Sequence, residues 1–171
     1  MIHRLALTAL LLLLAGCGFS PLYGGAGGTA LQANLAGISV SPIPERSGQI
    51  LRQSLLDRMG QSDPQYRLDI KLEQTDAGSG FRADEATTRI NITLLARYEL
   101  HRISDGKLIL SDETSAFSAY DVVESEYATL TARQDTLHDL AELLSQRITA
   151  RLVAHFRAAG DDSHETAAAG H

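Results

Sequence analysis

Alternating apolar and polar residues predict strands through the middle of the chain. Residues 66–75 place Tyr, Leu, Ile and Leu on one side and Arg, Asp, Lys and Glu on the other, which is the period of two of a strand with one buried face. Residues 88–103 alternate in the same way, and an Asp105-Gly106 hairpin signal returns the chain into a further strand at 108–120. We expect these two long strands to pair antiparallel across a two-residue turn.

Helical spacing of apolar residues predicts two helices on either side of these strands. A short strand at 38–42 leads into the first helix, which Ser47 can cap and Gly60 can end. The second helix has an arrangement like a capping box at its start, with Asp121 three residues before a Glu. Residues 124–156 then contain neither Gly nor Pro, and their leucines fall near one stripe.

This order of elements predicts an α+β fold. Strands with one apolar face and two amphipathic helices bury their apolar surfaces most simply when both helices pack on the same face of a four-stranded sheet. The first strand-helix-strand unit favours a parallel pair, so the sheet is expected to be mixed. We therefore predict a two-layer sandwich whose second helix is the long one, with a polar sheet face left for water or a partner.

The N-terminal residues have the pattern of an export signal. Residues 1–16 combine a short basic stretch with a ten-residue apolar run, too short to span a bilayer, and Ala15-Gly16 directly precede Cys17. This pattern resembles the bacterial lipobox, which implies that Cys17 carries an S-diacylglycerol and an N-acyl group. Several acyl chains together make a stable membrane anchor.

The remaining divisions follow from composition. Residues 17–37 are rich in glycine and predict a flexible tether, because such a stretch buries little apolar surface. Residues 38–157 form the predicted single domain, and residues 158–171 are polar and small, which predicts a disordered tail.

Composition also excludes several functions. The chain has 171 residues and a formal net charge of −6, whereas nucleic-acid-binding domains are usually basic on one face. Its single Cys cannot form an internal disulfide or a zinc site based on cysteine. We find no phosphate-binding glycine loop, nucleophile motif or metal-ligand spacing in the sequence. We therefore predict that the protein is not an enzyme and has no metal or cofactor.

Two arginines are the candidates for a binding site. Arg89 and Arg97 fall on the polar side of the strand at 88–103, where guanidinium groups can hold phosphates through two hydrogen bonds. The alternative is a charged strand face that keeps the protein soluble and deters pairing at the sheet edge.

Several short motifs resemble one family of lipoproteins. The sequence CGFSPLYG at 17–24 is similar to the mature N-terminus of lipopolysaccharide-assembly lipoproteins of the LptE family, especially those of alphaproteobacteria. The resemblance continues in the strand-to-helix passage at 43–52, in residues 66–68 after the first helix, in the part of the strand at 96–100, and in the Tyr-Asp pair before the long helix.

The resemblance implies a place and a set of partners. Members of this family are anchored on the periplasmic side of the outer membrane, where they plug the LptD β-barrel, assist its assembly and help to insert lipopolysaccharide into the outer leaflet. Lipopolysaccharide phosphates are then the ligands that Arg89 and Arg97 would meet. The alternative function is that of an auxiliary lipoprotein in a periplasmic lipid-transport ABC system, which also uses a lipobox and a small α+β domain.

Overall fold

The computed structural model describes residues 26–79 and 89–168, with side chains described for 31–78 and 89–159. Its helices and strands follow one another in the order that the hydrophobic pattern predicts, with one additional helix at the start. In chain order they are α2 (Ala26–Ala36), β1 (Ile38–Val40), α3 (Glu45–Met59), β2 (Tyr66–Ser79), β3 (Arg89–Arg102), β4 (Leu108–Asp121) and α4 (Glu126–Ala168).

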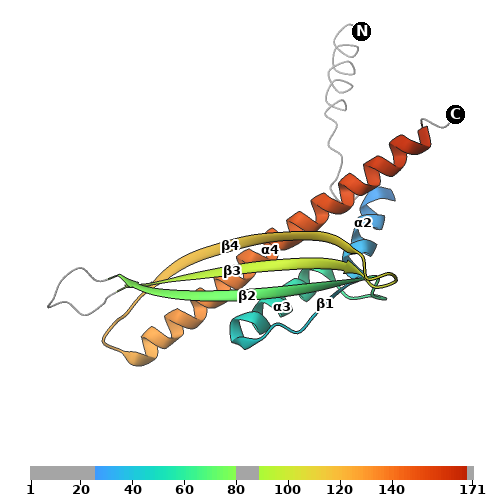
Figure 1. Cartoon of the computed structure of the whole chain (residues 1–171). Coiled ribbons are helices and arrows are strands. Elements are labelled where there is room, and N and C mark those ends of the chain that lie inside the picture. Colours follow the sequence, from blue (N-terminus) through green and yellow to red (C-terminus); the bar gives the residue numbers. More distant parts are fainter. Residues whose placement is uncertain (1–25, 80–88, 169–171) are drawn as a thin grey trace, which may run out of the picture. The chain divides into compact units, whose positions relative to one another are not determined.

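The four strands form one mixed sheet in the order β1-β2-β3-β4. β1 pairs parallel to the start of β2, with Ile38 opposite Tyr66. β2 pairs antiparallel with β3 along its whole length, and β4 continues the sheet on the other side of β3. Helices α3 and α4 lie on the same side of this sheet (Figure 1). The predicted two-layer α+β fold is therefore confirmed.

The core lies between the sheet and the two helices. Alternate residues of β2 and β3 point toward it because successive side chains of a strand face opposite sides, and α3 and α4 supply the facing leucines. The apolar side chains larger than alanine that have no exposed surface are Leu51 and Leu55 of α3, Leu68 of β2, Ile92, Leu94 and Leu100 of β3, and Leu144, Ile148 and Leu152 of α4. Full burial of such a side chain contributes about 1.5–3 kcal/mol, so this cluster dominates the stability of the domain.

A polar contact also fixes the two helices to each other. Arg58 of α3 donates a hydrogen bond from Nε to the hydroxyl of Ser145 over 2.8 Å, and Ser145 is fully buried in α4. An Nη atom of Arg58 reaches Glu142 at 2.7 Å. The Ser145 hydroxyl in turn donates to the Glu142 carbonyl, so this buried polar atom is satisfied.

The predicted flexible tether at 17–37 differs from the structure in its second half. Residues Ala26–Ala36 form helix α2, and Leu31 and Leu35 are buried in the core, 8% and 9% exposed. The glycine-rich composition of 17–37 does not reflect the sequence LQANLA at 31–36, whose residues mostly favour a helix and whose two leucines are four positions apart on one face. Residues 17–25 lie outside the described part of the chain.

The ends of α3 and β2 also differ from the predicted ones. α3 begins at Glu45 after Pro44, and Ser47 does not cap it but is buried, 3% exposed. Its predicted end is confirmed: Gly60 has a φ of +77°, and its N–H donates to the Leu56 carbonyl. β2 continues to Ser79, four residues beyond the end of the strand predicted at 66–75.

α4 begins later and extends further than predicted. Asp121 is the last residue of β4, and Ser125 takes the capping role, accepting a hydrogen bond from the Ala128 N–H over 3.3 Å. The helical backbone continues past Phe156 to Ala168, where the composition predicts disorder. This extension contains one helix-weakening residue, Gly160, among several alanines.

Candidate functional site

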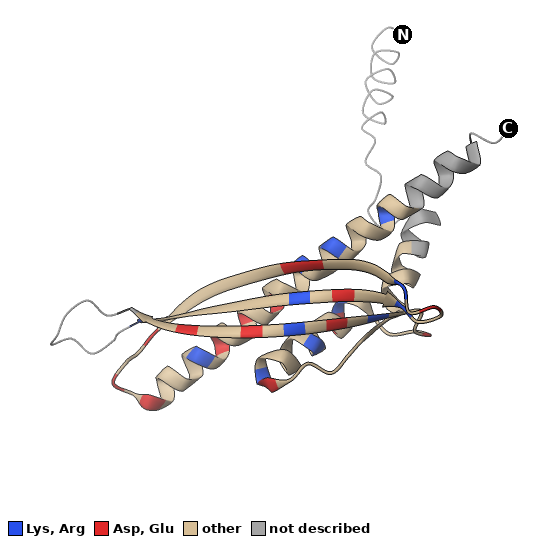
Figure 2. Cartoon of the chain, in the orientation of Figure 1, with Lys and Arg blue, Asp and Glu red and all other residues tan. Residues whose placement is uncertain are grey.

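The face of the sheet opposite α3 and α4 is uncovered by any other described helix or strand, and we call it the open face (Figure 2). The strand register arranges its side chains in rows that cross β2, β3 and β4. From the end near β1 these rows are Asp69-Glu99-Ser111, Lys71-Arg97-Glu113, Glu73-Leu95-Ser115, Thr75-Thr93-Phe117 and Ala77-Asn91-Ala119. Acidic and basic residues alternate along β2 in the first three rows, the two rows through Thr93 and Asn91 are uncharged, and a last row, Ser79-Arg89-Asp121, is charged again.

Arg97 lies at the centre of the charged half of the open face. Its Nη1 atom donates to Glu73 Oε1 at 2.5 Å, and its Nε atom donates to Glu113 Oε2 at 3.2 Å. One guanidinium therefore joins all three long strands. The Arg97 side chain is half exposed, so each of these ion pairs contributes little to stability, about 0–1 kcal/mol.

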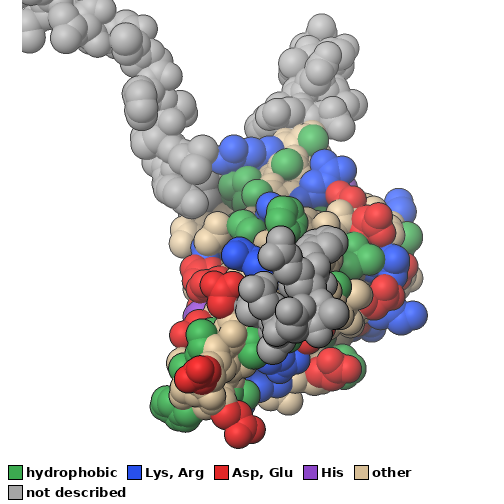
Figure 3. Space-filling model, turned by 90° about the vertical axis from the view of Figure 1, so that its left-hand side faces the viewer, with side chains coloured by type: hydrophobic (Ala, Val, Ile, Leu, Met, Phe, Trp, Pro, Cys, Tyr) green, Lys and Arg blue, Asp and Glu red, His purple; other side chains and the backbone are tan. Residues whose placement is uncertain are grey.

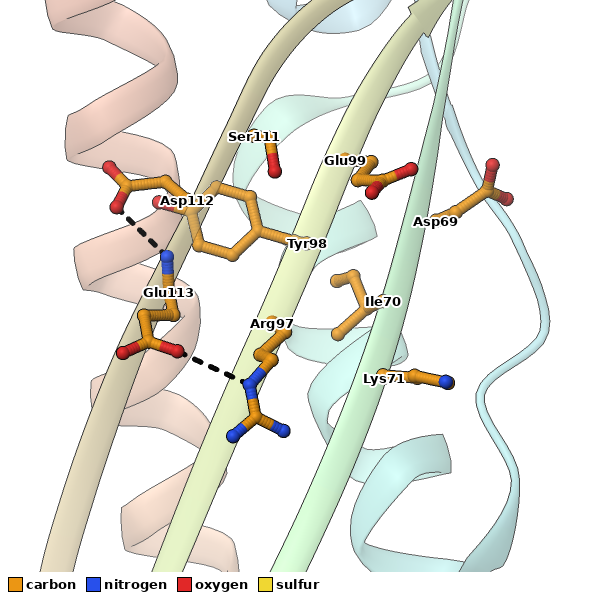
Figure 4. A pocket seen from close by; sticks show the side chains of 9 residues that line it. All are labelled: Asp69, Ile70, Lys71, Arg97, Tyr98, Glu99, Ser111, Asp112 and Glu113. Carbon is orange, nitrogen blue, oxygen red and sulfur yellow. Dashed lines mark hydrogen bonds and ion pairs between the residues drawn. The ribbon is translucent and has the colours of Figure 1, made fainter.

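A shallow depression of about 670 Å³ lies beside this arginine. Figure 4 shows its lining, in which Arg97 points toward Glu113 while Lys71 extends outward on β2. Asp69 and Glu99 stand at one side and Ser111 at another. The depression thus combines two cations with four carboxylates, counting Asp112 and Glu113, so its lining is not electropositive and a phosphate at Arg97 would compete with these carboxylates.

Arg89 lies at the far end of the open face. Its Nη1 atom is 3.6 Å from Asp121 Oδ1, on the neighbouring strand, and both side chains are more than half exposed. The register places Arg89 eight residues from Arg97 along β3, about 26 Å apart at the rise of a strand. The structure therefore puts both candidate arginines on one face, as expected, but does not bring them together.

Three carboxyl groups on or near the open face are held ionised by their neighbours. Burial acts to raise the pKa of Asp69, but hydrogen bonds from Ser41 and Arg67 lower the pKa overall. The backbone N–H of Glu113 and the Arg151 guanidinium lower the pKa of Asp112. The backbone N–H of Lys107 and the charge of Arg102 lower the pKa of Asp105. These groups act as fixed anions rather than as proton donors near neutral pH.

Tyr98 lies beneath the same region with its ring in the core. Burial, together with the nearby charge of Asp112, raises the pKa of the Tyr98 hydroxyl to about 12. The hydroxyl therefore stays neutral. This arrangement suits a structural side chain, because a catalytic acid or base needs a pKa near the working pH.

Helix arginines cover carbonyl groups on both edges of the sheet. Arg52 of α3 donates from Nε to the Val40 carbonyl of β1 over 3.1 Å, and Arg147 of α4 donates to the Ser115 carbonyl of β4. Arg151 pairs with Asp112 on β4 at 2.7 Å. These contacts occupy backbone groups of the two edge strands, which would otherwise be available for pairing with other chains.

No cluster that favours a catalytic or metal site occurs in the described residues. They contain no group of three metal-ligating side chains, and no described helix combines the length and apolarity needed to cross a membrane. At the end of the domain that carries the connection between β2 and β3, acidic and basic side chains are interspersed with apolar ones (Figure 3). The candidate lipid-attachment residue Cys17 lies outside the described residues.

Sequence reasoning missed the carboxylates that neutralise Arg97. A two-residue turn at Asp105-Gly106 would have placed Thr114 opposite Arg97. The structure instead has a five-residue connection and a register shift between Leu100 and His101, which bring Glu113 opposite Arg97. A shift of one residue reverses which side chains share a face, and no local signal in the sequence marks this bulge.

Solved structures with the same fold come from bacterial lipoproteins. A Caulobacter crescentus protein described as a lipoprotein has a TM-score of 0.63 at 18% identity, with 74% of this chain and 95% of that chain covered. Lipoprotein B from Nitrosomonas europaea has a TM-score of 0.54 at 12% identity, with 74% and 87% covered. At these identities the likeness shows the fold alone.

Two comparisons of sequence extend over most of the chain. An uncharacterised protein of Rickettsia prowazekii is 25% identical over 155 residues, which are 90% of this chain and 98% of that protein. Residues 35–152 match the family model for LptE, described as lipopolysaccharide-assembly. This is a family of non-enzymatic lipoproteins, which confirms the prediction that the protein is not an enzyme. The chain therefore belongs to the LptE family of lipopolysaccharide-assembly proteins.

Proposed function

We propose that this protein is a lipoprotein component of the outer-membrane translocon that inserts lipopolysaccharide into the outer leaflet. In this role it plugs the lumen of an LptD-type β-barrel and assists the assembly of that barrel. The match of residues 35–152 to the LptE family carries the proposal. The family match favours it over the alternative, an auxiliary lipoprotein of a lipid-transport ABC system.

The open face supports a contact with the wall of a hydrated barrel. The lumen of such a barrel is polar, and the open face offers ion-paired charges and small uncharged side chains, with the exposed aromatic Phe117 among them. Pairing Arg97 with Glu73 and Glu113 lowers the cost of moving these charges out of bulk water.

The length of the strands also fits a barrel lumen. β2, β3 and β4 each contain 14 residues, which corresponds to about 46 Å at about 3.3 Å per residue. A bilayer with its headgroups is about 40–45 Å thick. A sheet of this length can contact a membrane-spanning barrel along most of its height.

The proposal includes a lipid anchor at Cys17, with an S-diacylglycerol and an N-acyl group, on the periplasmic side of the outer membrane. The lipobox pattern at 14–17 supports it. We expect a Cys17→Ser variant to accumulate as an unprocessed precursor without acyl label. Normal processing of that variant would show that Cys17 is not the anchor.

Direct contact with lipopolysaccharide phosphates through Arg89 and Arg97 is a second part of the proposal. The geometry makes this binding competitive, since a phosphate at Arg97 must displace Glu73 or Glu113. Charge reversal of both arginines should weaken lipopolysaccharide binding while changing the thermal midpoint by only a few degrees. Unchanged binding would show that both arginines serve only as a charged strand face that keeps the protein soluble.

Site-specific photo-crosslinking in intact cells tests the barrel contact. A photoreactive amino acid at Phe117, which is 82% exposed on the open face, should give an adduct with a large β-barrel protein. The same amino acid at exposed Gln146 of α4 is the matched control and should give a weaker adduct if the open face carries the contact. An adduct from Phe117 to an inner-membrane transporter would instead support the ABC-system alternative.

A further inference from the structure

The hairpin between β3 and β4 exposes two aliphatic side chains at its tip. Ile103 is 49% exposed and Leu108 is 48% exposed. Two backbone hydrogen bonds close the turn: the Gly106 N–H donates to the Arg102 carbonyl, and the Arg102 N–H donates to the Lys107 carbonyl, each over 2.9 Å. Gly106 has a φ of +68°, which suits this turn. The tip is therefore a fixed projection rather than a loose loop.

The charges of this tip are partly neutralised within it. Asp105 pairs with Arg102 at 3.1 Å and also accepts the backbone N–H of Lys107 at 3.1 Å. The Lys107 ammonium has no ion pair among the described residues. The tip thus presents two aliphatic side chains next to one uncompensated positive charge, which is the combination that favours the headgroup region of an anionic bilayer.

The hairpin tip lies at the end of the sheet where the chain from the N-terminus enters. The Gln65 N–H donates to the Gly37 carbonyl at 2.8 Å, and the Ile103 N–H donates to the Gln65 carbonyl at 3.0 Å. These bonds place the start of β1 and the hairpin side by side. Helix α2 begins at Ala26, only nine residues after Cys17, and nine residues span at most about 32 Å when fully extended, which is less than the length of the sheet.

We propose that the tip at Ile103–Leu108 is a second membrane contact, which rests on the phospholipid leaflet that holds the lipid anchor. Ile103 and Leu108 enter the boundary between headgroups and acyl chains, and Lys107 contacts lipid phosphates. This contact orients the sheet relative to the membrane. This proposal depends on the lipid anchor of the proposed function. It does not depend on the barrel or on lipopolysaccharide.

The opposite end of the sheet provides an internal comparison. Val123 is 50% exposed there, close to the end of β4 and therefore about 40 Å or more from the hairpin along the strand. Its apolar character and its exposure are close to those of Leu108. It lies, however, at the end of the sheet opposite to the one that the N-terminal connection enters. A membrane contact set by the anchor should therefore involve Leu108 and not Val123.

Tryptophan fluorescence tests this difference, because the natural chain contains no Trp. The full-length, acylated protein is reconstituted into phosphatidylethanolamine–phosphatidylglycerol vesicles as a Leu108→Trp variant and, separately, as a Val123→Trp variant. We expect a blue-shifted emission and quenching by brominated lipids for Leu108→Trp alone. Mass spectrometry confirms acylation of each sample, so a missing anchor is distinguished from a missing tip contact.

A second set of variants measures the contribution of the tip. In unacylated protein, replacing Ile103 with Ser and Lys107 with Glu should reduce the weak partitioning onto the same vesicles about tenfold, whereas Val123→Ser should not change it. Equal fluorescence of the two Trp variants would overturn the proposal. Emission from Leu108→Trp that stays solvent-exposed on vesicles and shifts only after a barrel protein is added would overturn it in favour of a protein contact.

Discussion

Arg97 and Glu113 stand directly opposite each other on β3 and β4, with Nε and Oε2 3.2 Å apart. The same guanidinium reaches Glu73 on β2 at 2.5 Å. The residue with the best geometry for holding a phosphate on this face is therefore already occupied by two carboxylates. Lipopolysaccharide binding after removal of one carboxylate distinguishes a binding role of Arg97 from a role that only links the strands.

We predict that Glu113→Gln increases lipopolysaccharide binding several-fold. The substitution removes a competing negative charge from Arg97 but changes the free energy of unfolding by less than about 1 kcal/mol, because the pair is exposed. Glu99→Gln is the matched control, since it makes the same charge change on the same face next to His101 instead. Equal effects of the two variants would indicate a general charge effect, and no effect of either would identify Arg97 as a structural link.

Gly48→Ala should destabilise the domain by about 1–3 kcal/mol. A Cβ atom at Gly48 would lie 2.5 Å from Cγ2 of Ile43 and 3.1 Å from its backbone carbonyl carbon, so the buried connection into α3 must shift. Urea denaturation measures the change, with Gln49→Ala, an exposed neighbour, as the control. Adding Ile43→Ala should give less than the sum of the two single effects. An unchanged midpoint for Gly48→Ala would show that this packing is looser than described.

Much of the fold can be predicted from the hydrophobic pattern, since period is a local property. The alternation along β3 correctly separates buried Ile92 and Leu94 from exposed Asn91 and Thr93. The open face follows from the same alternation, because only one side of each strand is apolar. The positive φ of Gly60 agrees with its predicted role at the end of α3.

The remaining features depend on contacts between distant residues. α2 is stable as a helix because Leu31 and Leu35 enter the core, which local glycine content does not reveal. The neutralisation of Arg97 depends on a bulge whose position is set by tertiary packing. For the same reason the strand face predicted Arg89 and Arg97 as candidates but not the carboxylates that accompany them.

Leu35→Ala tests whether α2 is part of the domain. The side chain is 9% exposed, and removing it should cost about 2–5 kcal/mol, as for other buried leucines. Gln32→Ala, on the exposed side of α2, should change stability by less than about 0.5 kcal/mol. If both variants unfold at the midpoint of the unmodified protein, residues 31–36 do not contribute to the core.

Acid should destabilise the domain partly through Asp69. Its pKa is lowered in the folded state, chiefly through Ser41 and Arg67 acting against burial, so the unfolded state binds the proton more readily. The stabilisation is complete above the ordinary carboxyl pKa of about 4 and is lost as pH falls through the lower folded value. Asp69→Asn should therefore flatten the pH dependence of unfolding below about pH 4. If the pH dependence of unfolding is unchanged in Asp69→Asn, other carboxylates cause it.

The most direct test of the account is the composition of the complex that this protein forms in its own membrane. Affinity purification of the acylated protein from outer membranes in mild detergent should yield a stable complex with one large β-barrel protein, and lipopolysaccharide should co-purify. Recovery of the protein as a free monomer, or together with an inner-membrane transporter and no barrel, would contradict the proposed role in the translocon.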